Sequence, residues 1–166
     1  MSRSFRRIGA LGAATVALVT FGAAAPASAT APRAVDLEFT LYAAEIVVDE
    51  DEGDTAAPGV GDHFAFADDL YRTKGGEKVG RDGVSCTVVR TGDPSDLQCV
   101  GTFVLTGGAD GRIAGQTLLS VEADAQQPPA FDIAVTGGTG DFKDVRGYIR
   151  STPDGDYSRL DFHLTR

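Results

Sequence analysis

The feature that most constrains the fold is an alternation of apolar and polar residues with a period of two, which continues along most of the chain after residue 34. Turns rich in Gly, Asp and Pro separate the alternating runs, and no segment keeps the 3.6-residue period of an amphipathic helix. Eight runs can be counted, near residues 35–48, 62–72, 80–90, 97–106, 112–121, 130–135, 142–151 and 157–165. The pattern predicts an all-β domain over residues 35–166.

The connections between these runs are short, as in the glycine-rich segment 107–111, and they suit antiparallel hairpins. Eight consecutive antiparallel strands commonly form either a closed up-and-down barrel or a two-sheet sandwich. Because a Greek-key sandwich needs a long crossover, hairpin-length links favour a single eight-stranded antiparallel up-and-down barrel. The interior of such a barrel holds either side chains or one small ligand.

The first 29 residues are typical of a secretory signal peptide. Three arginines among the first seven residues precede an uncharged, mostly apolar stretch, and the small residues 27–29 suit cleavage before Thr30. A retained membrane anchor is the alternative, which the short, Gly/Ala-rich stretch disfavours, and the Arg6-Arg7 pair leaves twin-arginine export open. We expect a secreted, extracellular protein with no membrane contact after cleavage and a flexible lead-in over residues 30–34.

The charge balance excludes some partners. The chain has 15 Lys+Arg against 24 Asp+Glu, and this acidic balance argues against a nucleic-acid partner. Its two His leave little for a histidine-built metal site, and we expect no metal and no cofactor. Residues 49–54 hold five carboxylates; a calcium loop is conceivable, but the EF-hand spacing is incomplete and a solvated acidic loop is favoured.

The two cysteines, Cys86 and Cys99, lie symmetrically about the turn sequence at 91–94. A hairpin with that turn places them opposite each other, so the spacing predicts a cross-strand disulfide. The alternative is a free thiol in a pocket.

Two acidic residues interrupt the apolar faces of the first two predicted strands. Glu45 shares the parity of the apolar residues before it, and Asp68 lies among aromatic residues of its own face. An unpaired buried carboxylate is costly, so each must be paired, protonated, hydrogen-bonded or hydrated. Their mutual repulsion in a partly dry cavity would raise at least one pKa and suit the pair to proton transfer; a solvated barrel mouth is the alternative.

Arg146 extends this hypothesis. If its face of the strand is interior, its guanidinium could neutralise Glu45 or Asp68 or bind a ligand oxygen; if exterior, it is a surface cation. The pattern does not decide between the two faces. The residues expected to line a ligand pocket are Leu41, Ala43, Phe64, Phe66, Leu119 and Tyr148.

Four motifs give the stretch 61–164 a resemblance to a known superfamily. They are GDHFAFADDLY at 61–71, VGR at 79–81, TGGTGDF at 136–142 and VRGY at 145–148. In order and spacing they resemble the allene oxide cyclase and dirigent superfamily of small eight-stranded barrels. The most specific element is GGTG-x-F followed by RGY, which resembles the dirigents most.

The resemblance implies that a reactive intermediate is cyclised or coupled inside the barrel without a cofactor, and that the barrel forms a homotrimer. It aligns Asp68 with a polar residue after the second-strand aromatic, Cys86 with a pocket cysteine of the cyclases, and Arg146 with a dirigent pocket arginine. Glu45 resembles a dirigent aspartate, whereas Ala43 stands where the cyclases have an acid, which argues against allene oxide cyclase activity itself.

We therefore expect a secreted barrel that binds a small apolar or aromatic molecule and guides its cyclisation or stereoselective coupling. Glu45 and Asp68 would exchange protons, and Arg146 would anchor the ligand or stabilise charge. A non-catalytic carrier or scavenger of a hydrophobic ligand and a structural barrel with a filled interior are the alternatives.

Overall fold

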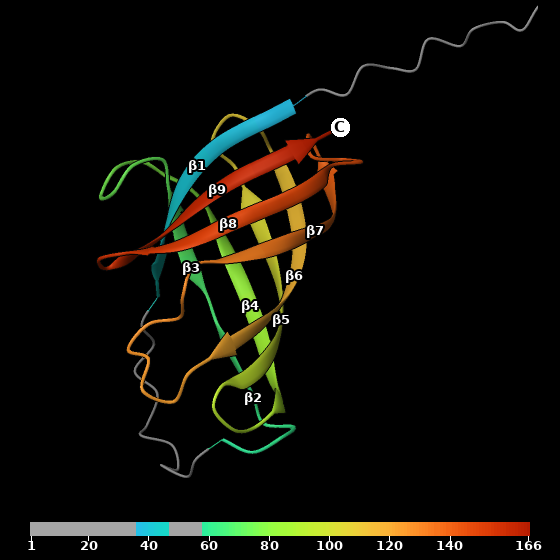
Figure 1. The fold of residues 1–166 in the computed structure, drawn as a ribbon. Helices are drawn as coiled ribbons and strands as arrows, with labels where there is room; N and C mark the ends of the chain where they lie inside the picture. The colour runs from blue at the N-terminus through green and yellow to red at the C-terminus, as the bar shows by residue number, and fades with distance from the viewer. Residues whose placement is uncertain (1–35, 47–57) are drawn as a thin grey trace, which may run out of the picture. The chain divides into compact units, whose positions relative to one another are not determined.

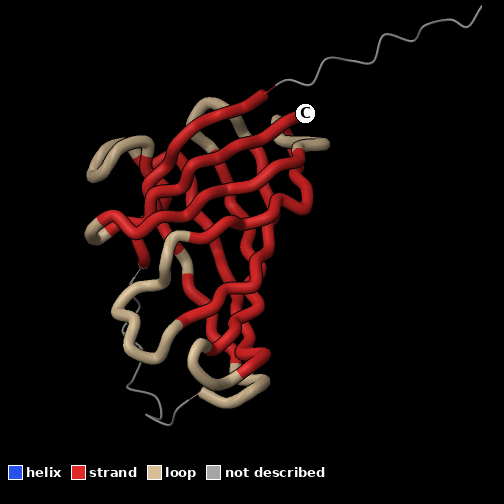
Figure 2. Tube along the Cα trace, in the orientation of Figure 1, coloured by secondary structure: helices blue, strands red, loops and turns tan. Residues whose placement is uncertain are grey.

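The computed structural model describes residues 36–46 and 58–166, and within these ranges it contains nine strands and no helix (Figures 1 and 2). The strands are β1 (Asp36–Glu45), β2 (His63–Phe66), β3 (Asp68–Tyr71), β4 (Lys78–Arg90), β5 (Ser95–Leu105), β6 (Gly111–Val121), β7 (Phe131–Gly140), β8 (Arg146–Asp154) and β9 (Tyr157–Thr165). The predicted signal peptide at 1–29, the lead-in at 30–34 and the acidic loop at 49–54 lie outside the described residues. No helix in the described part of the chain is long and apolar enough to span a membrane.

The strands form the predicted eight-stranded up-and-down barrel. From β3 to β9 each strand pairs antiparallel with the next, and β1 pairs with both β3 and β9, which closes the ring. Figure 1 shows the closure as the blue first strand lying beside the red last strand. β2 and β3 lie one after the other along β4, in a register that continues from His63 to Leu70 and shifts at Tyr71, so together they fill a single strand position.

The glycine-rich segment at 137–140 is part of a strand and does not form a turn. It continues β7, and Gly137, Gly138 and Gly140 pair with β6. A Cβ atom on Gly138 would overlap the carbonyl oxygen of Phe142, and one on Gly140 would overlap that of Asp110, so only glycine allows this close backbone approach. The turn follows at residues 141–145.

Apolar side chains fill one end of the barrel. The ring of Phe39 stacks on Phe162 with centroids 4.4 Å apart, and Phe103 meets the same ring edge-on at 5.6 Å. Phe162 and Leu164 are each 1% exposed. This core takes side chains between residues 37 and 43 of β1 and between 160 and 164 of β9, and it leaves the C-terminal end of β1 and the N-terminal end of β9 available for a site.

The predicted disulfide is confirmed. Cys86 on β4 and Cys99 on β5 are direct cross-strand partners, and their sulfur atoms are bonded. Both side chains lie on the interior face of the barrel and both are buried. The alternative of a free pocket thiol is therefore excluded.

Candidate active site

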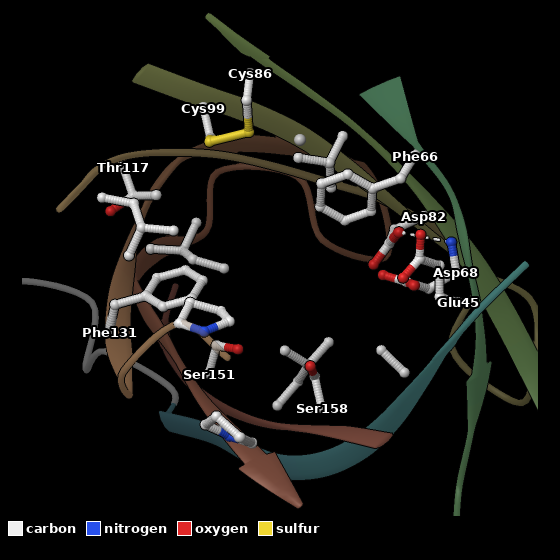
Figure 3. A pocket seen from close by; sticks show the side chains of 18 of the residues that line it. Glu45, Phe66, Asp68, Asp82, Cys86, Cys99, Thr117, Phe131, Ser151 and Ser158 are labelled. Carbon is white, nitrogen blue, oxygen red and sulfur yellow. Dashed lines mark hydrogen bonds between the residues drawn. A yellow bond between two sulfur atoms is a disulfide. The ribbon is translucent and has the colours of Figure 1, made fainter. Parts of the chain in front are cut away.

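The end of the barrel opposite the core contains a cavity of about 660 Å³. Its walls are mainly apolar and include Phe64 and Phe66 of β2, Leu119 of β6 and Phe131 of β7. Figure 3 shows Phe66 and Phe131 on different sides of this hollow, with the Cys86–Cys99 disulfide along another part of its wall. The volume is sufficient for a drug-sized molecule.

Two glycines keep this part of the barrel hollow. Gly101 of β5 and Gly115 of β6 are direct cross-strand partners, and both line the cavity. A Cβ atom on Gly101 would lie 3.3 Å from Cγ2 of Val84, and one on Gly115 would lie 2.7 Å from Cγ2 of Ile133. Side chains at these positions would extend into the space that the cavity occupies.

Three carboxylates from three strands meet at the cavity wall. Glu45 of β1 and Asp68 of β3 are direct cross-strand partners. The backbone N–H of Asp68 donates a 3.1 Å hydrogen bond to Oδ1 of Asp82 on β4. In Figure 3 the three acidic side chains lie together beside Phe66. The structure thus brings together the two acids predicted from the sequence and adds a third.

The surroundings of Asp68 and Asp82 favour the protonated forms of these two acids. Asp82 is only 5% exposed, and this burial, together with the negative charge of Asp68 and a side-chain hydrogen bond to it, raises the pKa of Asp82 to about 8. Burial also raises the pKa of Asp68, and the charges of Glu45 and Asp69 act in the same direction, while the hydrogen bond from Asp82 opposes them. Near neutral pH, Asp82 therefore holds a proton and donates it in a hydrogen bond to the carboxylate of Asp68.

Four of the six predicted pocket residues line the cavity: Ala43, Phe64, Phe66 and Leu119. Leu41 does not; it is 5% exposed within the apolar core, because it lies one interior position closer to the filled end than Ala43. Tyr148 is also elsewhere, since its ring stacks on His163 with centroids 4.8 Å apart and is 44% exposed on the outside of the barrel.

Arg146 is not brought to the acids. On β8 the interior face carries Ile149 and Ser151, which are buried, whereas Arg146 is exposed on the alternate face. Its guanidinium donates to the carbonyl oxygen of Val145 at 2.9 Å. The open question of which face of this strand is interior is thus decided against an inward Arg146.

Among the polar cavity residues that were not predicted from the sequence, Asp82 and Ser151 are the two that are buried. The signal for Asp82 was present, because it alternates with Val84 and Cys86 and so has the same interior parity that identified Glu45 and Asp68. Ser151 is 6% exposed and lines the cavity, where it offers a hydroxyl to a ligand. Within the described residues, no group of three or more His, Cys, Asp or Glu is arranged to hold a metal ion.

Residues 43–160 match the family model of the allene oxide cyclase barrel-like domain. Among solved structures, a pyocyanin demethylase is 26% identical with a TM-score of 0.61, and the match covers 77% of this chain and 99% of that one. Two pterocarpan synthase dirigent proteins, each 18% identical, share the fold with TM-scores of 0.52 and 0.55; the matches cover 80% and 81% of this chain and 88% and 94% of theirs. Comparison with curated proteins gave no match.

Proposed function

We propose, since this chain belongs to the allene oxide cyclase barrel-like family, that it is a secreted barrel that binds a small apolar or aromatic molecule and promotes its cyclisation or another isomerisation without a cofactor. The observation that carries the proposal is the carboxyl pair of Asp68 and Asp82 in the wall of a mainly apolar cavity. A protonated carboxyl beside an ionised one is the arrangement that a proton-transfer reaction needs.

Each acidic residue has a different catalytic role, which its surroundings determine. Asp82, kept protonated by burial, acts as the general acid toward a ligand oxygen or nitrogen. Asp68 acts as the general base and takes a proton from the ligand, and the neighbouring Glu45, whose charge raises the pKa of Asp68, makes it a stronger base. The reaction moves protons within one molecule, so it needs no co-reactant.

The cavity walls add positioning. Aromatic and aliphatic side chains exclude water from a bound molecule and hold it in one geometry, which favours one ring closure or one stereochemical outcome over its competitors. The same property would let the barrel direct the coupling of reactive intermediates that form elsewhere. The pterocarpan synthase dirigent proteins share this barrel fold.

The proposal of secretion rests on the amino-terminal sequence and on the disulfide. A disulfide between Cys86 and Cys99 is consistent with an extracellular protein, because such bonds persist in oxidising compartments. A trimeric assembly is proposed on the family resemblance alone.

A carrier function is the second candidate, favoured by the size of the cavity and by the exposed rings of Phe64 and Phe66 at its wall. A carrier needs the apolar walls but not the proton on Asp82. The two functions therefore differ in what the carboxyl pair does.

The experiment starts with protein recovered from its own culture medium, from which co-purified small molecules are identified by native mass spectrometry. Pyocyanin, the compound that appears in the name of the pyocyanin demethylase, is tested as a further ligand by calorimetry. Conversion of each bound compound is then followed for wild type, Asp68→Asn and Asp82→Asn by mass spectrometry and optical spectra. We expect both variants to bind, and both to lose at least tenfold in conversion rate.

Binding with unchanged conversion in both variants would defeat the catalytic role of the pair. Binding without conversion by wild type would favour the carrier function. Absence of any bound molecule, co-purified or added, would contradict both functions and leave a structural barrel.

A further inference from the structure

The charged side chains that line the cavity all have the same sign. They are Glu45, Asp68 and Asp156, accompanied by the carboxyl of Asp82, which burial keeps protonated near neutral pH; no Lys, Arg or His is present among the described residues that line it. The polar side chains that accompany them are neutral hydroxyls and amides, such as those of Ser151 and Gln116. Within the described chain, the cavity therefore has acidic groups without an internal counterion.

The basic residues nearby in sequence are used on the outer face. Lys78 forms an ion pair with Asp69, whose side chain lies on the opposite face of β3 from Asp68. Lys74 forms an ion pair of 2.6 Å with Asp154, and its ammonium lies 5.9 Å from the ring centroid of Tyr157. These outer cations satisfy outer acids, and among the residues that the structure describes none is a basic partner of Glu45 or Asp68 in the cavity.

The aromatic walls favour the same kind of ligand. Phe64 and Phe66 project from one face of β2 with ring centroids 6.5 Å apart and ring planes inclined by 20°. They are 46% and 37% exposed, so their ring faces remain available. A flat aromatic ligand can stack on such rings, and a positive charge on it is attracted to their faces.

From this combination of charge and shape we propose that the cavity selects flat aromatic cations, such as nitrogen heteroaromatics that are quaternised or protonated, over neutral and carboxylate-bearing molecules of the same size. The inference rests on the proposed function in one respect, namely that the cavity takes a small molecule. A cation would serve as a counterion for Glu45 and Asp68, whereas a carboxylate would be repelled by the like charges of these acids. Selection thus follows from attraction of one class and repulsion of the other.

The test uses three probes with the same three-ring frame: 10-methylacridinium, acridine and acridine-9-carboxylate. Their affinities are measured by calorimetry at pH 8, where acridine is neutral. We expect the cation to bind at least about tenfold more tightly than acridine, since one carboxylate within contact distance supplies that factor in a partly solvated site. The carboxylate probe is expected to bind more weakly than acridine.

Two variants assign the preference to the cavity. Glu45→Gln and Asp68→Asn are expected to lower the affinity for the cation at least threefold each, while the affinity for neutral acridine stays unchanged. Glu38→Gln is the matched control, because Glu38 lies on the outer face of β1 and faces His163. Glu38→Gln removes one negative charge from β1, as Glu45→Gln does, and should leave the affinities for all three probes as in wild type.

The outcomes separate the inference from the proposed function. Acridine binding as tightly as the cation, or a tighter carboxylate probe, overturns the charge selection and leaves a small-molecule cavity. An equal loss in Glu38→Gln and in the two cavity variants also overturns it, because the preference would then belong to the acidic surface. Failure of all three probes to bind counts against the inference and the proposed cavity function together.

Discussion

The backbone N–H of Asp68 donates a hydrogen bond to Oδ1 of Asp82, across the pairing of β3 with β4. This bond holds the Asp82 carboxyl at the cavity wall and leaves its other oxygen to carry a proton toward Asp68. An asparagine side chain reproduces both contacts, because its carbonyl oxygen accepts and its amide donates. The Asp82→Asn substitution therefore removes the proton that Asp82 would transfer and keeps the two contacts between residues 68 and 82.

The Asp82→Asn variant should change the pH dependence of stability. In the folded protein the pKa of Asp82 is about 8, against an ordinary value of 3.8, so between these values the folded state holds a proton that the unfolded state has lost. The stability contributed by this proton is complete below about pH 4 and is lost as the pH rises through 8, at up to about 1.4 kcal/mol per pH unit. Asparagine removes this loss.

The free energies of unfolding of wild type and Asp82→Asn are compared by urea denaturation from pH 4 to 9. We expect the variant to gain on wild type steadily up to about pH 8, with no further gain above it. Glu38→Gln, on the exposed outer face, should run parallel to wild type. A constant difference between Asp82→Asn and wild type across the range would show that Asp82 is ionised in the folded protein.

Gly101→Leu should close the cavity without unfolding the barrel. The new side chain starts 3.3 Å from Cγ2 of Val84 and extends into space that is now empty, and leucine suits a strand better than glycine does. We expect at least a tenfold loss of affinity for any ligand of the cavity, measured by calorimetry, with stability within about 1 kcal/mol of wild type.

Gly83→Leu is the control for this substitution. Gly83 pairs with Thr102 on the neighbouring strand, and a Cβ atom there meets no atom within 4 Å. The same side chain on the outside of the barrel should leave binding unchanged. Equal binding by Gly101→Leu and wild type would place the ligand outside the cavity.

Most of the fold could be predicted from the sequence, because a period of two and short turns admit few closed topologies. The disulfide followed for the same reason, since pairing about one turn sets Cys86 opposite Cys99. The extent of β7 could not be predicted, because Gly138 and Gly140 permit a close strand pairing as readily as a turn. Glycine in a sequence does not distinguish the two.

The site was predictable only in part. Interior parity identified Glu45 and Asp68 and could have identified Asp82, since this rule needs only the strand register. The same rule could not orient Arg146, because apolar and polar residues lie on both faces of its strand until Ile149 is known to be buried. Where along the barrel the cavity begins depends on side-chain packing: Leu41 and Ala43 both belong to the buried core, but only Ala43 also lines the cavity.

Loss of the Cys86–Cys99 bond should destabilise the barrel by about 3 kcal/mol, the cost expected for freeing a loop of this length in the unfolded chain. The bond closes a sequence separation of 13 residues. Denaturation of the double Cys→Ala variant is compared with that of wild type, each with and without a thiol reductant. The reductant should affect wild type alone. If reduction leaves the denaturation of wild type unchanged, the pairing of β4 with β5 holds the barrel together without a contribution from the disulfide.

The two ends of the barrel should respond differently to the loss of an aromatic ring. Phe162 is 1% exposed and packs between Phe39 and Phe103, so Phe162→Ala should cost about 3–5 kcal/mol, through lost burial and an unfilled space. Phe66 is 37% exposed at the cavity wall, so Phe66→Ala should cost less than about 1.5 kcal/mol.

Binding should show the reverse order. Phe66→Ala removes a stacking surface and should weaken the binding of an aromatic cavity ligand by about twofold to twelvefold in calorimetry, because one aromatic pair contributes about 0.5–1.5 kcal/mol. Phe162→Ala leaves the cavity walls in place and should bind that ligand as wild type does at temperatures where it is folded. If instead Phe162→Ala weakens ligand binding as much as Phe66→Ala does, the packing of the filled end and the shape of the hollow end are coupled. The cavity would then depend on the core for its shape as well as for its stability.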